Sequence, residues 1–202
     1  MIINIIGDCD KRPVLYTVLK VCQTLGDVLL VTNSTRLARL SDTRDTYGHY
    51  QNIMVAITTE GIDDFLETFD YGLDSFAYVV VDNISLAEAD VTIYVEGMEQ
   101  SEEEKDILEY VETYETIKLY KGGLIASDTL KKLEEFEALR NCCPIGTKIA
   151  NAVGTVLAPK FGKDAKSFVE IAMQKNPMDD TSGLNKSVGR KKQGVKLPWP
   201  SK

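Results

Sequence analysis

Residues 27–33 read Asp27-Val28-Leu29-Leu30-Val31-Thr32-Asn33, a run in which apolar residues follow one another without the alternation of a half-exposed strand. A strand of this kind is buried on both faces, which favours a parallel sheet between two layers of helices. The strongest strand signal in the chain, Tyr78-Val79-Val80-Val81-Asp82, has the same character. The sequence therefore predicts an α/β protein.

Segments with strand and helix character alternate on either side of this run. We expect strands at residues 2–6, 27–33, 53–57, 78–82, 91–95 and 116–120. Between them, apolar residues recur at helical spacing after Pro13, Ile62, Ser101 and Ser127 or Asp128. The alternation predicts a doubly wound, mainly parallel sheet of about six strands.

The ends of two predicted helices carry recognisable signals. Asp10 is expected to cap the first helix, with Pro13 in its first turn and Gly26 at its end. Ser101 and Glu104 have the spacing of a capping box, in which each residue bonds the backbone of the other.

The chain changes character after Pro144. We expect a Rossmann-like or P-loop-like α/β domain over residues 1–143 and a helical extension over residues 144–175, where apolar residues again recur at helical spacing. Residues 176–202 are polar and basic and lack the apolar content to pack a core, so they are expected to form a flexible, disordered tail.

Charge is distributed unevenly along the chain. Residues 1–150 contain 13 Lys and Arg against 27 Asp and Glu, and residues 151–202 contain 10 against 4. The tail could bind nucleic-acid phosphates, an anionic surface or an acidic protein surface, or it could simply be a solvated end. The candidate contact residues are Lys186, Arg190, Lys191, Lys192, Lys196 and the single tryptophan, Trp199, which lies between two prolines.

Composition argues against several classes of protein. No apolar run approaches the roughly 20 residues of a membrane span, and residues 1–6 are too short and lack the basic flank of a signal peptide, so we expect a cytoplasmic protein. The four cysteines form no CxxC pair and His49 is the single histidine, so no structural metal is expected. His49 itself is interpreted as a loop or packing residue.

Two segments resemble a known family. The order strand, loop, helix, strand that ends at residues 28–31 resembles the opening of the ParA/MinD-like, deviant-Walker ATPases of the SIMIBI type. Residues 76–83, Phe76-Ala77-Tyr78-Val79-Val80-Val81-Asp82-Asn83, are similar to the family's strand that carries the Walker B aspartate, and residues 88–95 to its next strand. The resemblance covers roughly residues 1–125. It implies a P-loop-like fold, Asp82 as the Walker B-like residue, and dimerisation through the face that would cover a nucleotide.

The phosphate loop departs from that family. A Walker A loop needs glycines that let backbone N–H groups surround phosphates, and a terminal Lys-Ser/Thr pair. Gly7 is followed instead by Asp8-Cys9-Asp10-Lys11-Arg12-Pro13-Val14, without a second glycine and without that pair. Asp8 and Asp10 would repel phosphates, and Lys11 and Arg12 would offset this charge without restoring the cradle. We therefore expect no ATP hydrolysis, no catalytic residue and no cofactor.

Asp8, Asp10 and Asp82 are expected at the carboxyl ends of strands, where doubly wound sheets bind ligands. They could hold Mg²⁺ in a receiver-like phosphoacceptor site, with Lys118 or Lys121 as the late lysine, or they could merely cap strands and helices.

The resulting hypothesis is a non-catalytic assembly or adaptor protein with a degenerate nucleotide-binding fold. Such relatives act with protein partners in secretion or pilus machines, in DNA partition or transfer, and in phage or other mobile-element systems. One alternative is a weak nucleotide-binding or receiver-like switch. Another is a structural component of a phage or secretion particle.

Overall fold

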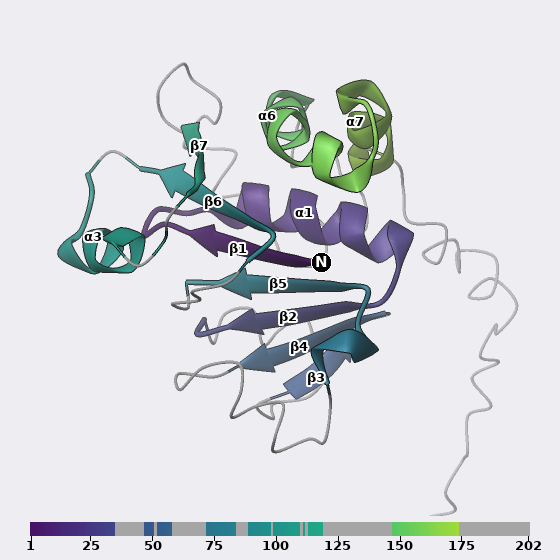
Figure 1. Cartoon of the computed structure of the whole chain (residues 1–202), viewed down its shortest axis with the longest axis horizontal. Helices are drawn as coiled ribbons and strands as arrows, with labels where there is room; N and C mark the ends of the chain where they lie inside the picture. Colours follow the sequence, from purple (N-terminus) through teal and green to yellow (C-terminus); the bar gives the residue numbers. More distant parts are fainter. Residues whose placement is uncertain are drawn as a thin grey trace, which may run out of the picture.

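A seven-stranded sheet forms the centre of the molecule (Figure 1). The computed structural model describes residues 1–34, 47–50, 52–57, 72–83, 89–97, 99–109, 111, 113–118 and 147–173. The strands are β1 (Ile2–Ile6), β2 (Val28–Thr32), β3 (Tyr47–Tyr50), β4 (Ile53–Ile57), β5 (Tyr78–Asp82), β6 (Val91–Glu96) and β7 (Glu115–Lys118). Their order is β3-β4-β2-β5-β1-β6-β7, and every neighbouring pair is parallel except β3 with β4. The predicted fold class, a doubly wound and mainly parallel sheet, is confirmed.

Most of the described helices lie on one face of this sheet. On one face lies α1 (Arg12–Leu25), with α6 (Thr147–Leu157) and α7 (Ala165–Met173) packed outside it (Figure 1). The largest hydrophobic cluster joins these three helices to the side chains of β1, β2, β4, β5, β6 and β7 that point toward them. On the other face, α3 (Glu102–Glu109) contributes Leu108 to a small cluster with Ile6 and Tyr94.

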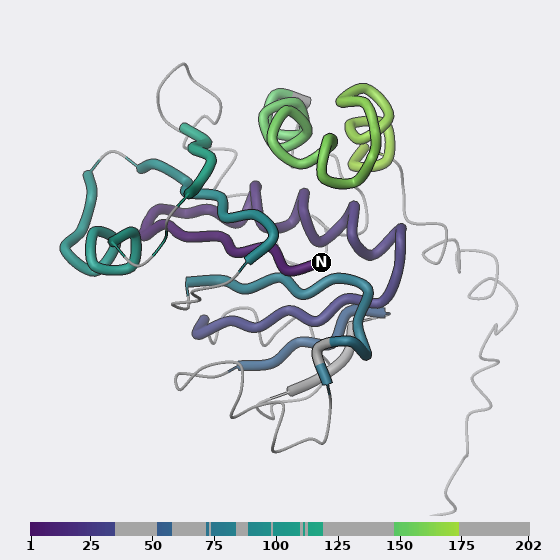
Figure 2. Tube along the Cα trace, in the orientation of Figure 1, coloured from purple at the N-terminus to yellow at the C-terminus, as the bar shows by residue number. Residues whose placement is uncertain are grey.

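The chain path explains why the central strands read as continuous apolar runs. Tracing Figure 2 from the N-terminus, the chain passes through β1 in the interior of the sheet, along α1, and back into β2. In β2 all five residues are buried, and alternate residues enter the clusters on opposite faces: Val28 and Leu30 face α1, whereas Leu29 and Val31 face away. Burial on both faces is the property that the sequence of this strand predicts.

Several predicted boundaries differ from the structure. β3 lies in the polar link between the second and third expected strands, where no strand was predicted. β7 begins at Glu115, one residue before the expected strand, and α3 ends at Glu109 although apolar spacing extends to Tyr114. The helices expected after Ile62 and after Ser127 lie outside the described residues.

Most of the predicted helix-end signals are confirmed, and one is wrong. Gly26 follows α1 and donates its N–H to the carbonyl of Cys22. Ser101 and Glu104 form the capping box: Glu104 N donates to Ser101 Oγ at 3.0 Å, and Ser101 N donates to Glu104 Oε2 at 3.2 Å. Asp10 does not cap α1, because its carboxylate pairs with Arg12 and the capping residue is Lys11, whose side chain makes no cap bond.

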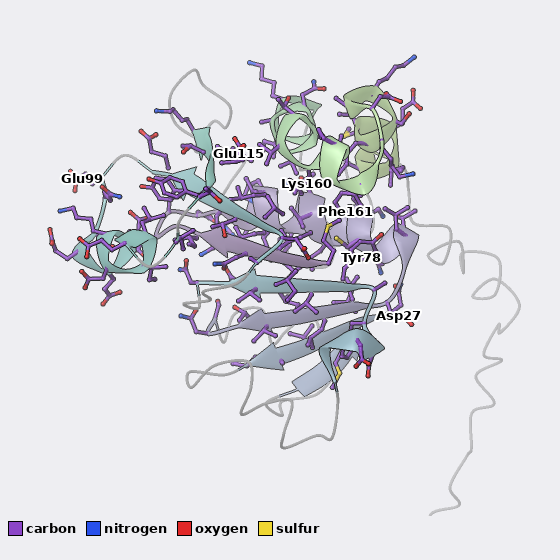
Figure 3. The ribbon with its side chains drawn as sticks, viewed as in Figure 1. Asp27, Tyr78, Glu99, Glu115, Lys160 and Phe161 are labelled. Carbon is purple, nitrogen blue, oxygen red and sulfur yellow. The ribbon has the colours of Figure 1, made fainter. Side chains whose placement is uncertain are left out.

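The two C-terminal helices form a hairpin that belongs to the main core. Phe168 of α7 is fully buried and lies 3.2 Å from the position that a Cβ on Gly154 of α6 would occupy, so the two helices approach closely. Phe161, in the short 3-10 helix η3 (Ala158–Phe161) between them, stacks on Tyr78 at the start of β5, with ring centroids 5.3 Å apart (Figure 3). The expected boundaries after residues 143 and 175 lie outside the described residues, as does the basic tail.

In the part of the chain that the structure describes, no helix combines the length and the apolar character that a membrane crossing requires.

Candidate functional site

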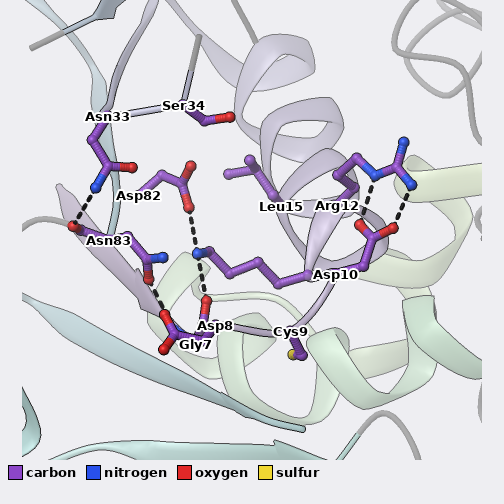
Figure 4. Close-up of a pocket in the computed structure, with 11 residues that line it drawn as sticks. Gly7, Asp8, Cys9, Asp10, Arg12, Leu15, Asn33, Ser34, Asp82 and Asn83 are labelled. Atoms are coloured by element: carbon purple, nitrogen blue, oxygen red, sulfur yellow. Dashed lines mark hydrogen bonds and ion pairs between the residues drawn. The ribbon is translucent and has the colours of Figure 1, made fainter. Parts of the chain in front are cut away.

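A pocket of about 460 Å³ opens at the carboxyl ends of β1, β2 and β5, beside the start of α1 (Figure 4). This edge is where doubly wound sheets bind ligands, because the strands end there and the loops that follow diverge. Its walls are formed by Gly7, Asp8, Cys9, Asp10, Lys11, Arg12, Leu15, Asn33, Ser34, Asp82 and Asn83.

The buried side chain of Lys11 forms part of the pocket lining. Its Nζ donates to the carbonyl oxygen of Gly7 at 2.8 Å and lies 2.9 Å from Asp82 Oδ1 (Figure 4). The Lys11 and Asp82 side chains are only 9% and 5% exposed. The ammonium group thus bridges the loop after β1 and the end of β5, as a bound cation would.

Asp82 is held on its other oxygen as well. Thr32, the last residue of β2, donates its hydroxyl to Asp82 Oδ2 at 2.7 Å, and the same Thr32 Oγ1 accepts the N–H of Ser34 at 3.0 Å. Strand pairing places Thr32 beside Asp82, and Asp82 beside Ile5 of β1. Three neighbouring strand ends therefore converge on one carboxylate, whose Oδ2 accepts a hydrogen bond and whose Oδ1 forms the ion pair with Lys11.

Gly7 and Asn83 fix the backbone around this carboxylate. Gly7 has φ +151°, and a Cβ there would lie 2.6 Å from the carbonyl oxygen of Val95, so this position requires glycine. Asn83 has φ +55°, a conformation that asparagine tolerates better than most residues. It donates its N–H to Ile5 O at 3.0 Å, accepts the Gly7 N–H on Oδ1 at 3.0 Å, and accepts a bond from Asn33 Nδ2 on its carbonyl at 3.2 Å.

The capping box of α3 also anchors the pocket loop. Glu104 is 1% exposed, and its Oε1 accepts the N–H of Asp8 at 2.5 Å while its Oε2 accepts the N–H of Ser101. Ser101 Oγ in turn donates to the carboxylate of Asp8. Tyr94 lies 3.5 Å from Glu104 Oε2, and burial, together with Glu104, raises the pKa of its hydroxyl to about 12. Glu104 thus fixes the loop to a helix on the opposite face of the sheet.

The remaining loop side chains are paired or buried. Asp10 and Arg12 form a two-point ion pair through Arg12 Nε and Nη2. Cys9 is half-buried, donates its thiol to the carbonyl of Val95 at 3.3 Å, and its own carbonyl accepts the Lys11 N–H at 2.7 Å. Burial raises the pKa of the Cys9 thiol from 9.0 to about 11. A neutral, hydrogen-bonded thiol is a poor nucleophile.

The arrangement limits what chemistry the site can perform. A phosphate cradle needs several backbone N–H groups directed at one point. In this loop the N–H groups of Gly7, Asp8 and Lys11 are bound to Asn83, Glu104 and Cys9. Among the described residues, no three His, Cys, Asp or Glu side chains are placed to hold a metal ion together. The backbone N–H groups and carboxylates that phosphate and metal binding would need are therefore bonded within the protein itself.

The site residues expected from the sequence divide into two groups. Gly7, Asp8, Asp10, Lys11, Arg12 and Asp82 all line the same pocket. Lys186, Arg190, Lys191, Lys192, Lys196 and Trp199 lie outside the described residues, as does Lys121. Lys118, the other late lysine considered, lies on β7 and pairs with Glu96 at 2.7 Å.

Five further residues belong to the site but were not predicted from the sequence: Thr32, Asn33, Ser34, Asn83 and Glu104. The first four directly end or follow β2 and β5, so the rule that ligand sites form at carboxyl strand ends could have identified them. Glu104 was recognised as a helix cap, but nothing in its spacing indicates a bond to Asp8.

Comparison of the chain with family models, curated proteins and solved structures gives no match.

Proposed function

We propose that this chain is a non-catalytic assembly or adaptor protein that uses a degenerate, ParA/MinD-like nucleotide-binding fold as a scaffold. The observation that carries the proposal is the position of Lys11, whose ammonium lies between the carbonyl of Gly7 and the carboxylate of Asp82. In the family that the sequence resembles, the corresponding aspartate serves the metal and the loop serves the phosphates. Here the aspartate and the loop are both bonded to the side chain of Lys11.

Energetics favour this interpretation. A metal ion could reach Asp82 only if the carboxylate separated from a buried ammonium, and breaking a buried ion pair costs about 3 kcal/mol or more. A penalty of that size lowers metal or nucleotide affinity by about 100-fold. Asp8 adds negative charge to the loop where a phosphate would approach, whereas the charge of Asp10 is balanced by Arg12. The pocket is thus a poor site for a nucleotide, while the fold around it is well packed.

The partners of such a scaffold are proteins. The resemblance favours action in a cytoplasmic machine for secretion or pilus assembly, for DNA partition or transfer, or for phage assembly, with a homodimer as the working unit. The basic residues 186–202 supply a contact to nucleic acid, an anionic surface or an acidic protein. If the protein is instead a structural component of a particle, removal of residues 176–202 prevents its incorporation and leaves the α/β domain folded.

The direct test of the non-catalytic role is phosphate release from ATP and GTP with Mg²⁺, measured on the full-length protein with and without DNA. We expect the rate to equal that of the buffer. An Asp82→Ala variant is the matched control, since activity that survives this change comes from a contaminant. Hydrolysis that requires Asp82 would refute the proposal.

One observation favours a second candidate, a receiver-like switch: Asp8, Asp10 and Asp82 all line one pocket, although they do not form a metal-binding cluster. A receiver needs its carboxylates free for Mg²⁺ and a phosphoryl group. Incubation with acetyl phosphate and Mg²⁺, followed by intact-mass analysis, distinguishes the receiver-like switch from the non-catalytic adaptor. A phosphoryl adduct that disappears in Asp82→Ala would establish the switch, and an unchanged mass supports the adaptor.

A further inference from the structure

We propose that the pocket at the carboxyl ends of β1, β2 and β5 binds an amide group of a partner polypeptide, either a carboxamide side chain or an exposed peptide group. The inference rests on the proposed function, because it assigns the partner contact of an adaptor to the place where a nucleotide would otherwise bind. It follows from the charge balance of the pocket and from the hydrogen-bonding groups that remain open in it.

The charge balance disfavours ionic ligands. Three carboxylates and two cations line the pocket, and the buried carboxylate of Glu104 lies behind the loop. The Lys11–Asp82 and Asp10–Arg12 pairs neutralise four of the five lining charges, and the fifth, Asp8, accepts a bond from Ser101. A phosphate or carboxylate would meet net negative charge, whereas a cation would find each carboxylate already bonded. A neutral polar group avoids both penalties.

Two carboxamides at the rim keep one open group each. Asn33 uses Nδ2 to bond the carbonyl of Asn83, which leaves Asn33 Oδ1 as an acceptor. Asn83 uses Oδ1 to accept the Gly7 N–H, which leaves Asn83 Nδ2 as a donor. Within the part of the chain that the structure describes, neither of these two atoms has a partner. Figure 4 shows both carboxamides on the same side of the pocket, next to Asp82.

One open donor and one open acceptor in the lining of the same pocket suit an amide, which offers one C=O and one or two N–H groups. Lys11 adds a third group, because an ammonium has three N–H donors and its two partners among the described residues are Gly7 and Asp82. The carbonyl oxygen of an incoming amide can accept the third N–H of this ammonium. Three hydrogen bonds hold Asn83, two through its backbone and one through its side-chain Oδ1, so its donor is pre-organised and loses little freedom on binding.

The size of the pocket suits this ligand. A volume of about 460 Å³ lies in the range of small-ligand sites and accommodates an asparagine or glutamine side chain together with the backbone on either side. The side chain of Leu15, from the first turn of α1, supplies an apolar wall for the methylene groups of such a residue. The occupant we assign is therefore a protruding, uncharged polypeptide segment.

The test uses three probes of equal size and different charge: acetamide, acetate and acetamidinium. Each is titrated into ¹⁵N-labelled full-length protein, and the carboxamide signals of Asn33 and Asn83 and the backbone signal of Gly7 are followed. We expect acetamide to shift these signals with an apparent Kd on the order of 10 mM, since so small a ligand cannot bind tightly. Acetate and acetamidinium should bind at least roughly ten-fold more weakly, as Coulomb repulsion and occupied carboxylates require. Equal or tighter binding of either ion, or no saturable shift with acetamide, would overturn the inference.

Two variants locate the effect. Asn33→Ala removes the open acceptor from an exposed position and should weaken acetamide binding about five-fold or more. Asn151→Ala makes the same change at an exposed position of α6, away from the pocket, and should leave binding unchanged. Equal effects of the two variants would contradict the assignment.

A fourth probe separates the failure of this inference from failure of the proposed function. Adenine also presents a donor beside an acceptor, so tighter binding of adenine than of acetamide would place a nucleobase in the pocket and overturn the amide site, and such binding together with Asp82-dependent hydrolysis would overturn both. Absence of acetamide and adenine binding, with no nucleotide hydrolysis, would overturn the amide site and leave the non-catalytic role standing.

Discussion

Lys11 Nζ lies 2.9 Å from Asp82 Oδ1 and 2.8 Å from the carbonyl oxygen of Gly7, so one side chain connects the first loop of the protein to the end of its central strand β5. Both charged groups are almost fully buried. A buried pair of this kind is costly to break from one side, because the remaining charge is left without a partner. Substitutions that remove one member of this ion pair should therefore lower the stability of the fold.

Removal of the Lys11 ammonium alone should destabilise the protein strongly, and removal of both members of the ion pair should cost less than the two single changes added together. Lys11→Met should lower the free energy of unfolding by about 3 kcal/mol, because it leaves the Asp82 carboxylate unpaired. Lys11→Met combined with Asp82→Asn should cost less than the sum of the single changes, with a coupling energy of about 1–3 kcal/mol in urea titrations.

Lys118→Met is the matched control for that cycle. Lys118 pairs with Glu96 at a similar distance, but its side chain is 48% exposed, so its loss should change stability by no more than about 0.5 kcal/mol. If Lys11→Met and Lys118→Met behave alike, the inner ion pair is not formed in solution.

Glu104 should be important for the loop as well as for its own helix. Glu104→Ala removes the acceptor of both Ser101 N and Asp8 N and should cost about 2–3 kcal/mol. Hydrogen exchange at the Asp8 amide should accelerate in this variant. The neighbouring Glu103 is exposed, and Glu103→Ala should change neither quantity. An Asp8 amide that exchanges equally fast in both variants would show that Glu104 does not hold the loop.

Asn4 is expected to reduce the stability of the sheet. It is fully buried in the interior strand β1, between Val81 and Thr92 of the neighbouring strands, and neither atom of its carboxamide has a hydrogen-bond partner among the described residues. Replacement by an apolar residue removes this desolvation penalty, so Asn4→Val should raise the free energy of unfolding by about 1–2 kcal/mol. Ile3→Val, a loss of one methylene on the same strand, should lower it by about 1 kcal/mol. A destabilised Asn4→Val variant would mean that the amide has a partner in solution.

The Cys9 thiol should react slowly despite its place in the pocket. Burial raises its pKa from 9.0 to about 11, so at pH 8 the thiolate fraction falls about 100-fold below that of an unperturbed cysteine. Peptide-resolved alkylation with iodoacetamide should show this lag relative to the same peptide in urea. The rate should rise about ten-fold per pH unit up to pH 11, and a plateau near pH 9 would indicate an ordinary pKa.

The parallel sheet could be predicted because burial on both faces leaves a clear signature in β2 and β5. The edge strand β3 could not be predicted, because Tyr47–Tyr50 includes a glycine and follows a polar link. It also pairs antiparallel at the edge of the sheet, where local propensity is a weak guide to strand formation. The start of α1 was misplaced by one residue because Asp10 has two favourable partners, the helix backbone and Arg12. The ion pair with Arg12 prevails.

The site was predictable in position and less so in detail. Strand-end geometry is enough to bring Asp8, Asp10 and Asp82 together. The Lys11–Asp82 contact depends on the register that places Ile5 beside Asp82, and no single segment encodes that register. The role of Asn83 depends on a positive φ that its sequence neighbours do not indicate.

The central claim is that the side chain of Lys11 occupies the place where a nucleotide complex would bind. Isothermal titration of the full-length protein with ATP–Mg²⁺ and with GTP–Mg²⁺ tests it most directly. We predict no saturable heat at millimolar nucleotide for the wild-type chain. Saturable binding that is lost in Asp82→Ala would show that the loop from Gly7 to Arg12 opens into a working phosphate site, and it would contradict the account.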